Sequence, residues 1–327
     1  MNNFKNICFF GGGSWGQALA ITLARTGYPT SILVSDKKRK EILNSNNSNC
    51  FPDIKFPNLI KAFCEKQNLK NYDLIFITTE SLRVESSLSE IIKINPQSNV
   101  IITSKGFANL KGETFPQLIF KKYSQLSFGV LTGPTFADEV ARNLPAAAII
   151  ASKNKLLADS VSKLFFNSSL RLYLSNDVIG ASIAGAIKNI MAIGAGISDG
   201  LHLGENAKAG LITRGIEETC RIINKCGGKK ETAFGLAGVG DMTLTCSTPN
   251  SRNMKFGIDL VKKNKQLKNK LVEGLHALKA AKSLSERLDI ETPIINAIND
   301  VINNKKDFKK IISELLNRPI KSEFKLN

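Results

Sequence analysis

The stretch that decides the fold is Ile7-Cys8-Phe9-Phe10-Gly11-Gly12-Gly13-Ser14-Trp15-Gly16. An apolar run there ends in the pattern G-x-G-x-x-G, and the helix-like run Gln17–Thr26 follows directly. In such a pattern Gly11 permits a tight turn, Gly13 lets a pyrophosphate approach the backbone, and Gly16 allows a helix to pack closely on a strand. The N–H groups and positive dipole end of that helix favour phosphate binding. We therefore predict a strand, turn and helix that bind a dinucleotide; a purely structural glycine turn is the alternative.

Further apolar runs of strand length recur along the first half of the chain. The predicted strands are Asn6–Phe10, Ser31–Val34, Leu74–Thr78, Val100–Thr103, Phe128–Leu131 and Ala147–Ala151. The stretches between them are long enough for helical crossovers, which is typical of a parallel, doubly wound sheet. From about Gly180 small and apolar residues recur at helical spacing instead, and Ser175-Asn176-Asp177 is suited to start a helix. We expect an α/β fold: an N-terminal Rossmann domain over residues 1–180, with a mostly parallel sheet, followed by an all-helical C-terminal domain over residues 181–327.

The composition limits the class of protein. Among 327 residues there are 45 Lys+Arg and 28 Asp+Glu, a formal charge of +17, and a hydrophobic content of 43% that excludes intrinsic disorder. The lysines are spread along the chain or gathered in runs such as 262–265 and 305–310, without the interleaved aromatics that nucleic-acid binding favours. We expect an anionic small molecule as partner and no nucleic acid. A basic nucleic-acid binder or a cofactor-binding regulator without turnover is the alternative from a different class.

Cysteine usage and hydropathy bear on the compartment. The six cysteines form no C-x-x-C pair, and two histidines offer little for a zinc cluster, so we expect free thiols, no metal and a cytoplasmic location. No uncharged apolar run reaches the roughly 18 residues of a membrane span, because Lys188 interrupts the most hydrophobic helix. The short apolar start runs directly into glycines, unlike a signal peptide. We expect no membrane insertion.

The residues after the second predicted strand leave the cofactor open. Asp36 lies 20 residues beyond Gly16, where an acidic residue would hydrogen-bond the ribose 2′-hydroxyl of NAD. Lys37-Lys38-Arg39 follow directly and suit the 2′-phosphate of NADP, while Ser35 adds no charge. The cofactor is therefore NAD or NADP, and the basic triplet slightly favours NADP.

Three further segments carry groups suited to an anionic substrate. Lys105 follows the fourth predicted strand, at the edge where ligands of open α/β sheets bind. In the small-residue helix around Lys188, close packing would desolvate the amine and favour the uncharged form of a general base, unless the side chain reaches solvent. The glycine-punctuated loop 235–241 ends in Asp241, and Arg252 beyond it suits bidentate phosphate binding.

Taken together, these motifs resemble the NAD(P)-dependent glycerol-3-phosphate dehydrogenases, in particular the bacterial cytoplasmic type. The resemblance covers nearly the whole chain and rests on several motifs in one order. They are Gly11–Gly16 with Ser14-Trp15, Ser104-Lys105-Gly106, Gly133-Pro134-Thr135-Phe136-Ala137, Gly185-Ala186-Ile187-Lys188-Asn189, Gly238-Val239-Gly240-Asp241, Ser251-Arg252-Asn253 and Val272-Glu273-Gly274. Gly12 departs from the usual alanine. Ser35 stands where relatives often have histidine or arginine, which keeps the choice between NAD and NADP open.

The resemblance implies a role for each matching residue. Lys188 would be the proton acceptor, oriented by Asp241, and these two are the implied catalytic residues. The implied substrate contacts are Lys105, Gly133, Thr135, Lys188, Asp241, Ser251, Arg252 and Asn253, with Arg252, Asn253 and Lys105 on the phosphate. The implied cofactor contacts are Ser14, Trp15, Lys105, Ala137, Arg252 and Glu273, which join Gly11, Gly13 and Gly16 of the glycine motif.

The family also implies a reaction and an assembly. The reaction would interconvert dihydroxyacetone phosphate and sn-glycerol 3-phosphate with NAD(P)H or NAD(P)+, supplying glycerol 3-phosphate for phospholipid synthesis, and the assembly would be a homodimer. Another two-domain Rossmann dehydrogenase, of the 3-hydroxyacyl or 6-phosphogluconate type, is the alternative enzyme.

Overall fold

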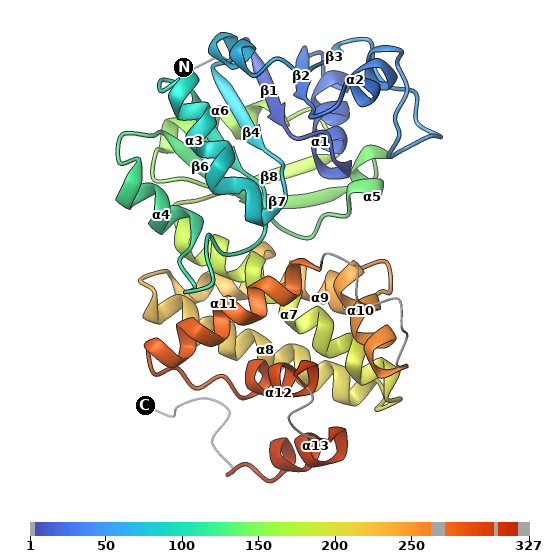
Figure 1. Ribbon diagram of the computed structural model, residues 1–327, viewed down its shortest axis with the longest axis vertical. Coiled ribbons are helices and arrows are strands. Elements are labelled where there is room, and N and C mark those ends of the chain that lie inside the picture. Colours follow the sequence, from blue (N-terminus) through green and yellow to red (C-terminus); the bar gives the residue numbers. More distant parts are fainter. Residues whose placement is uncertain (1–3, 263–271, 304–306, 320–327) are drawn as a thin grey trace.

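The computed structural model describes residues 4–262, 272–303 and 307–319. An N-terminal part built on one sheet lies above a C-terminal part made of helices (Figure 1). The expected fold class, a Rossmann-type α/β part followed by a helical part, is confirmed. Of the two lysine-rich runs, residues 263–265 and 305–306 lie outside the described residues.

One sheet of eight strands organises the N-terminal part, in the order β3-β2-β1-β4-β5-β6-β7-β8. β7 runs antiparallel to β6, and every other neighbouring pair is parallel. Its strands are β1 (Ile7–Phe10), β2 (Thr30–Leu33), β3 (Ile60–Phe63), β4 (Leu74–Ile77), β5 (Asn99–Ile102), β6 (Phe128–Thr132), β7 (Ala146–Ala151) and β8 (Leu170–Ser175). The carboxyl ends of β1, β4, β5 and β6 therefore meet at one edge, which is where open α/β sheets bind ligands.

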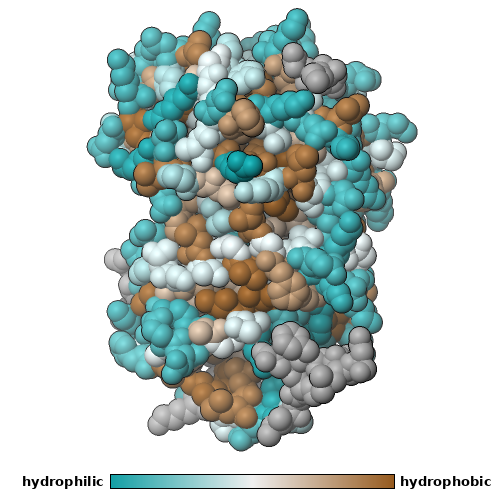
Figure 2. All heavy atoms as spheres, turned by 180° about the vertical axis from the view of Figure 1, so that it is seen from behind, coloured by the Kyte–Doolittle hydropathy of each residue, from teal (hydrophilic) through white to brown (hydrophobic). Residues whose placement is uncertain are grey.

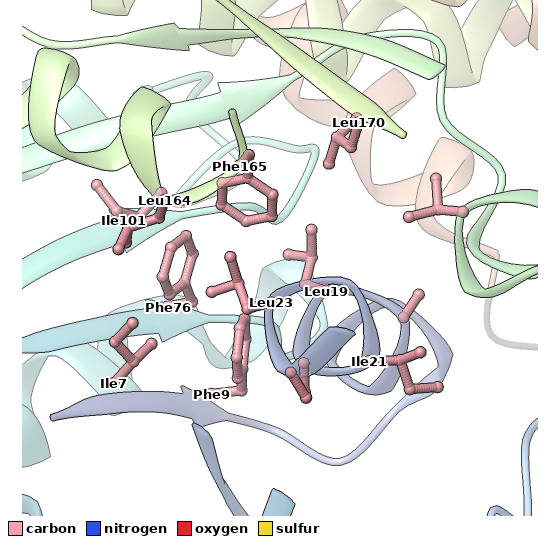
Figure 3. Packing of buried hydrophobic residues seen from close by; sticks show 14 of the residues in the cluster. Ile7, Phe9, Leu19, Ile21, Leu23, Phe76, Ile101, Leu164, Phe165 and Leu170 are labelled. Carbon is pink, nitrogen blue, oxygen red and sulfur yellow. The ribbon is translucent and has the colours of Figure 1, made fainter. Parts of the chain in front are cut away.

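Helices cover both faces of this sheet. They are α1 (Ser14–Arg25), α2 (Lys37–Asn44), α3 (Val84–Ile94), α4 (Phe115–Lys122), α5 (Ala137–Ala141) and α6 (Lys155–Leu164), with the 3-10 turns η1 (Lys66–Asn71) and η2 (Ser81–Arg83). On one face Phe9 stacks on Phe76 with ring centroids 4.9 Å apart, and Phe165 meets Phe76 edge-on at 6.3 Å (Figure 3). A second apolar cluster, which includes Ile75 and Leu88, fills the other face. Both faces of the sheet are thus buried, as a parallel sheet requires.

The sequence analysis missed two of the strands, β3 and β8. Both differ from the continuous apolar runs that mark fully buried parallel strands. In β3 the exposed Lys61 divides a four-residue segment, and in β8 Arg171 and Tyr173 alternate with the buried Leu170 and Leu172. β3 and β8 are the two edge strands of the sheet, where half-buried, alternating sequences are common.

The C-terminal part packs its helices around α7 (Val178–Gly200). The remaining elements are α8 (Glu205–Lys225), η3 (Lys230–Phe234), the π-helical turn η4 (Leu236–Gly240), α9 (Asp241–Cys246), α10 (Arg252–Val261), α11 (Glu273–Arg287), α12 (Pro293–Ile302) and α13 (Phe308–Leu316). The change from sheet to helices falls between Ser175 and Val178. We propose the domain boundary there, close to the expected division at 180 and 181.

Helix α7 is apolar all round because it is the centre of the helical part. In the part of the chain that the structure describes, it is the one helix long and apolar enough to cross a membrane, but 94% of its apolar window is buried inside the molecule. Its glycines allow unusually close helix contacts. A Cβ on Gly196 would lie 2.0 Å from the Met254 carbonyl oxygen, and a Cβ on Gly257 would lie 2.2 Å from the Ile193 carbonyl oxygen. Helices α7 and α10 therefore touch backbone to backbone.

Asp177 fixes the start of α7, as the sequence predicts. Its carboxylate accepts hydrogen bonds from the Gly180 N–H at 2.9 Å, the Lys229 N–H at 2.9 Å and the Thr232 hydroxyl at 2.6 Å. The side chain is buried, with 7% of the residue exposed. One carboxylate thus caps α7 and holds the segment that follows α8 against it.

Replacing Asp177 with Ala should therefore destabilise the protein. We expect the free energy of unfolding to fall by about 2–4 kcal/mol, because a helix cap and two further hydrogen bonds to a charged group are lost together. Urea denaturation followed by circular dichroism measures this loss. Asp53→Ala is the matched control, since the Asp53 side chain is 74% exposed and makes one long ion pair with Arg142. Equal denaturation midpoints for the two variants would contradict the prediction.

Candidate active site

The glycine motif forms the turn between β1 and α1 that the sequence predicts. Gly11 has φ +125°, and a Cβ on it would lie 3.0 Å from the Thr78 carbonyl carbon. A Cβ on Gly16 would lie 2.2 Å from the Gly11 carbonyl oxygen, so the helix start must be glycine. Gly13, the exposed N-cap of α1, has open space where its Cβ would point, and no side chain caps the helix. The turn therefore leaves the N-terminus of α1 accessible to a dinucleotide pyrophosphate.

Three residues expected on the cofactor surround this turn or the adjoining helix. Ser14 is exposed at the first position of α1, and the half-buried Trp15 packs against the apolar cluster that contains Phe9 and Phe76. Ala137 begins α5, which lies directly beside α1. The structure therefore brings the Gly11–Gly16 segment and Ala137 into one region.

Two lysines share one carboxylate where the two parts of the molecule meet. The Lys105 Nζ lies 2.5 Å from Asp241 Oδ2, and the Lys188 Nζ lies 3.1 Å from Asp241 Oδ1. Lys105 follows β5, Lys188 lies on α7 and Asp241 begins α9. Asp241 is 1% exposed, and the two lysine side chains are 15% and 10% exposed. We call these three residues the lysine–aspartate cluster.

Each ammonium group of the cluster keeps one N–H donor free for a ligand. Lys105 also donates to the Gly133 carbonyl at 3.0 Å, and Lys188 donates to the Thr245 hydroxyl at 2.9 Å. An ammonium group has three N–H donors, and the interactions with Asp241 and with Gly133 or Thr245 use two of them. The remaining donors are available to substrate oxygens.

The arrangement of the cluster lowers the pKa of Lys105. Burial lowers the pKa of Lys105 to about 8, Asp241 opposes that change, and the positive charge of Lys188 adds to it. A lysine that loses its proton near neutral pH can exchange protons during a reaction, so the cluster has the properties expected of an acid–base site.

Thr245 is a site residue to which the sequence analysis gave no role. Its hydroxyl accepts from Lys188 and donates to the Asp241 backbone carbonyl at 2.6 Å. The signal was present in the sequence, because Thr245 lies four residues after Asp241 and side chains at that spacing share a helix face. The hydroxyl fixes the direction in which the Lys188 amine points.

The carboxyl end of β6 supplies further expected residues. Gly133 has φ +154°, and a Cβ there would lie 2.7 Å from the Ala148 Cα, so its carbonyl can reach Lys105 only because the residue is glycine. The Thr135 hydroxyl donates to the same carbonyl at 3.2 Å. Thr132, just before this turn, has a buried hydroxyl with no hydrogen-bond partner among the described residues.

Asn253 joins three helices of the C-terminal part. Its amide donates to the Asn189 Oδ1 at 2.9 Å and accepts from the Gly274 N–H at 3.0 Å, which ties α10 to α7 and to the start of α11. The buried amide nitrogen without a partner among the described residues belongs to Asn189, directly after Lys188. Asn189 was quoted within the helix motif but received no role.

Arg252 and Glu273 bring two further charges to the site. Arg252 is exposed at the first turn of α10, and its guanidinium donates no hydrogen bond to the described residues. Ser251 before it is buried, and its hydroxyl caps α10 by accepting from the Met254 N–H at 3.3 Å. Burial raises the pKa of Glu273, whereas the positive charges of Arg252, Lys188 and Lys105 lower it. Arg252, Lys188 and Lys105 therefore lie close enough to Glu273 for their charges to act on it.

Metal-ligating residues do not gather in the described ranges. No group of three or more His, Cys, Asp or Glu side chains suited to a metal ion occurs there, and the six cysteines are free thiols.

Comparison with known proteins places this chain in a family. The profile described as the N-terminus of NAD-dependent glycerol-3-phosphate dehydrogenase matches residues 6–158, and the profile of the C-terminus matches residues 177–313. A glycerol-3-phosphate dehydrogenase (NAD(P)+) from Francisella tularensis subsp. novicida is 36% identical over 329 residues, covering 98% of this chain and 99% of the relative.

Solved structures show the same likeness. The glycerol-3-phosphate dehydrogenase from Coxiella burnetii has a TM-score of 0.88 and 33% identity, covering 96% of this chain and 99% of its own. The enzyme of the same name from Saccharomyces cerevisiae shares the fold, with a TM-score of 0.82 at 23% identity and coverage of 96% and 99%. The resemblance carried by the motifs is confirmed, and the chain belongs to the family of NAD(P)-dependent glycerol-3-phosphate dehydrogenases.

Proposed function

We propose that this protein interconverts dihydroxyacetone phosphate and sn-glycerol 3-phosphate, using NAD(P)H or NAD(P)+. The observation that carries the proposal is the lysine–aspartate cluster, which places two ammonium groups with free donors at the ligand-binding edge of the sheet. Its position beside residues of the helical part suits a small substrate enclosed between the two parts. The family match over both parts favours this reaction over that of a 3-hydroxyacyl or 6-phosphogluconate dehydrogenase.

The residues around the glycine motif fit a dinucleotide. The open space at Gly13 admits a pyrophosphate, and the uncapped N-terminus of α1 offers it N–H donors. Ser14, Trp15 and Ala137 adjoin this place. When bound there, the cofactor supplies or accepts the hydride.

Lys188 exchanges the proton in the proposed reaction. In the oxidation direction its amine accepts the proton of the C2 hydroxyl, and in reduction its ammonium form donates to the carbonyl oxygen. Asp241 and Thr245 hold the nitrogen in place, each within 3.1 Å. The free donor of Lys105 is available to an oxygen of the substrate phosphate, the role that the family resemblance implies for it.

The phosphate of the substrate is held away from the reacting carbon. Arg252 is suited to bind it bidentately, because its guanidinium is exposed and donates no hydrogen bond to the described residues. Asn253 contributes by fixing α10 against α7, and the free amide nitrogen beside it, on Asn189, adds a donor. Binding energy at the phosphate then positions the carbon next to Lys188.

Self-association and a biosynthetic role complete the proposal. Figure 2 shows apolar residues gathered across the middle of the rear face. Such a patch supports a homodimer, for which light scattering should give twice the chain mass.

We further propose that the protein works in the cytoplasm and supplies glycerol 3-phosphate for phospholipid synthesis.

Replacing Lys188 with Ala tests the reaction. We expect kcat to fall by about 10²- to 10⁴-fold in dihydroxyacetone phosphate reduction, because proton transfer loses its donor. Cofactor affinity, measured by NAD(P)H fluorescence titration, should stay unchanged. Lys255→Ala, at an exposed position on α10, is the control and should keep full activity. Near-normal turnover by the Lys188 variant would disprove the assignment, and no turnover by the folded wild-type protein would disprove the function.

The pH dependence of the reduction tests Lys105. Its lowered pKa means that the ammonium form is present below about pH 8 and is lost above it. We therefore expect kcat/KM for the anionic substrate to decrease as the pH rises through about 8. In Lys105→Arg, whose guanidinium stays charged, that decrease should move to higher pH. An unchanged profile in the variant would assign the titration to another group.

A further inference from the structure

The loop that carries Lys105 joins β5 to α4, and its first residues are held against the sheet. The Ser104 hydroxyl donates to the Thr79 carbonyl at 2.6 Å. A Cβ on Gly106 would lie 2.7 Å from the Ser81 Cβ, so this turn packs closely on η2. The backbone on both sides of Lys105 therefore lies close to the residues that follow β4.

Phe107, two residues after Lys105, enters the helical part. Its side chain is 0% exposed and belongs to the apolar cluster that fills that part, with members on α7 and α11 such as Ile187 and Leu278. Among the buried residues of this cluster that the structure describes, Phe107 is the only one that precedes α7 in the chain. The position of its ring is therefore determined by the close-packed helices and not by the sheet.

The same loop has a second contact with the helical part. Gly112 has φ +79°, and a Cβ there would lie 2.5 Å from the Leu284 Cβ and 2.8 Å from the Ala280 carbonyl oxygen on α11. The Arg287 guanidinium, at the end of α11, donates to the Lys111 carbonyl at 3.3 Å. The loop is therefore fixed on α11 beyond the buried ring as well.

These contacts bear on where the Lys105 ammonium group lies. A lysine side chain is long and flexible, so its nitrogen keeps one position only when the backbone that carries it is fixed. The side chain passes Gly185 of α7, where a Cβ would lie 3.5 Å from the Lys105 Cγ, and its nitrogen reaches Asp241 on α9. The ring of Phe107 thus fixes the loop to the same group of helices that its lysine must reach.

We propose that Phe107 is a positioning residue for Lys105, whose ammonium group it holds against Asp241 by anchoring the loop in the core of the helical part. Phe107 acts through Lys105, because its own side chain is fully buried among apolar residues. The inference rests on the proposed function only for the use that the reaction makes of Lys105. The position of the amine needs no ligand, so it can be measured without turnover.

Competitive labelling with acetic anhydride measures the state of the amine. Only a neutral amine reacts, so labelling of the ligand-free protein across a pH series, followed by peptide mass spectrometry, gives the pKa and the limiting reactivity of Lys105. The variants compared are Phe107→Ala, Phe107→Leu and Phe107→Val. Phe165→Ala is the matched control, because Phe165 is 1% exposed and belongs to the cluster on the sheet that contains Phe9 and Phe76.

We expect the Lys105 amine of the wild type to titrate with a pKa of about 8. Phe107→Ala should raise this pKa toward the ordinary lysine value, because burial is the main cause of the lowering and the released amine gains water. The limiting reactivity of the amine should rise as well. Phe107→Leu should stay close to the wild type, and Phe107→Val should lie between. Phe165→Ala should leave both quantities unchanged, although it loses a buried ring of the same size.

Reduction of dihydroxyacetone phosphate gives the corresponding functional change. At neutral pH, kcat/KM should fall by about 10- to 100-fold in Phe107→Ala, mainly through KM, because a displaced Lys105 no longer meets the substrate in the right place. The decrease of kcat/KM with rising pH should move above pH 8, in parallel with the pKa from labelling.

A Lys105 pKa and reactivity in Phe107→Ala equal to those of the wild type would overturn the proposal. An equal change in Phe165→Ala would also overturn it, since the loss of any buried ring would then displace the amine. If Phe107→Ala does not fold, Phe107→Val decides by the same criterion. A wild-type protein with the expected labelling but no turnover would refute the proposed function and leave the positioning of Lys105 supported.

Discussion

The arrangement of the site depends on one buried carboxylate between two buried ammonium groups. Asp241 is 1% exposed and lies within 3.1 Å of the nitrogens of Lys105 and Lys188. Two positive charges this close repel each other, and burial removes the water that would screen them. The carboxylate offsets both costs, and because one lysine follows a strand and the other lies on α7, it also joins the two parts of the molecule.

Small residues make that charge arrangement possible. Gly185 lies one turn before Lys188 on α7, and a Cβ there would lie 3.0 Å from the Thr132 hydroxyl and 3.5 Å from the Lys105 Cγ. The missing side chain lets α7 approach the ends of β5 and β6 closely enough for both lysines to reach Asp241. The composition of α7 is therefore a packing requirement of the active site, and its high hydropathy is a consequence of burial.

The sequence predicted those parts of the structure that local chemistry determines. The glycine motif, the buried strands and the cap at Asp177 each follow from backbone freedom, periodicity or hydrogen bonding within a few residues. The edge strands β3 and β8 were missed because their half-buried patterns are weak on their own. The contacts of Thr245 with Lys188 and of Asn189 with Asn253 join residues 57 and 64 positions apart, and no local pattern specifies them.

The backbone contact between α7 and α10 has a consequence for substrate size. At Gly196 and Gly257 the backbones of α7 and α10 are in direct contact, with no side chain between them. A sliding movement of one helix along the other would therefore bring backbone atoms into a clash. Lys188 lies on one of these helices and Arg252 begins the other. The helix pair therefore keeps a fixed distance between Lys188 and Arg252, and under the proposed function that distance would select substrates by the separation of their phosphate and carbonyl.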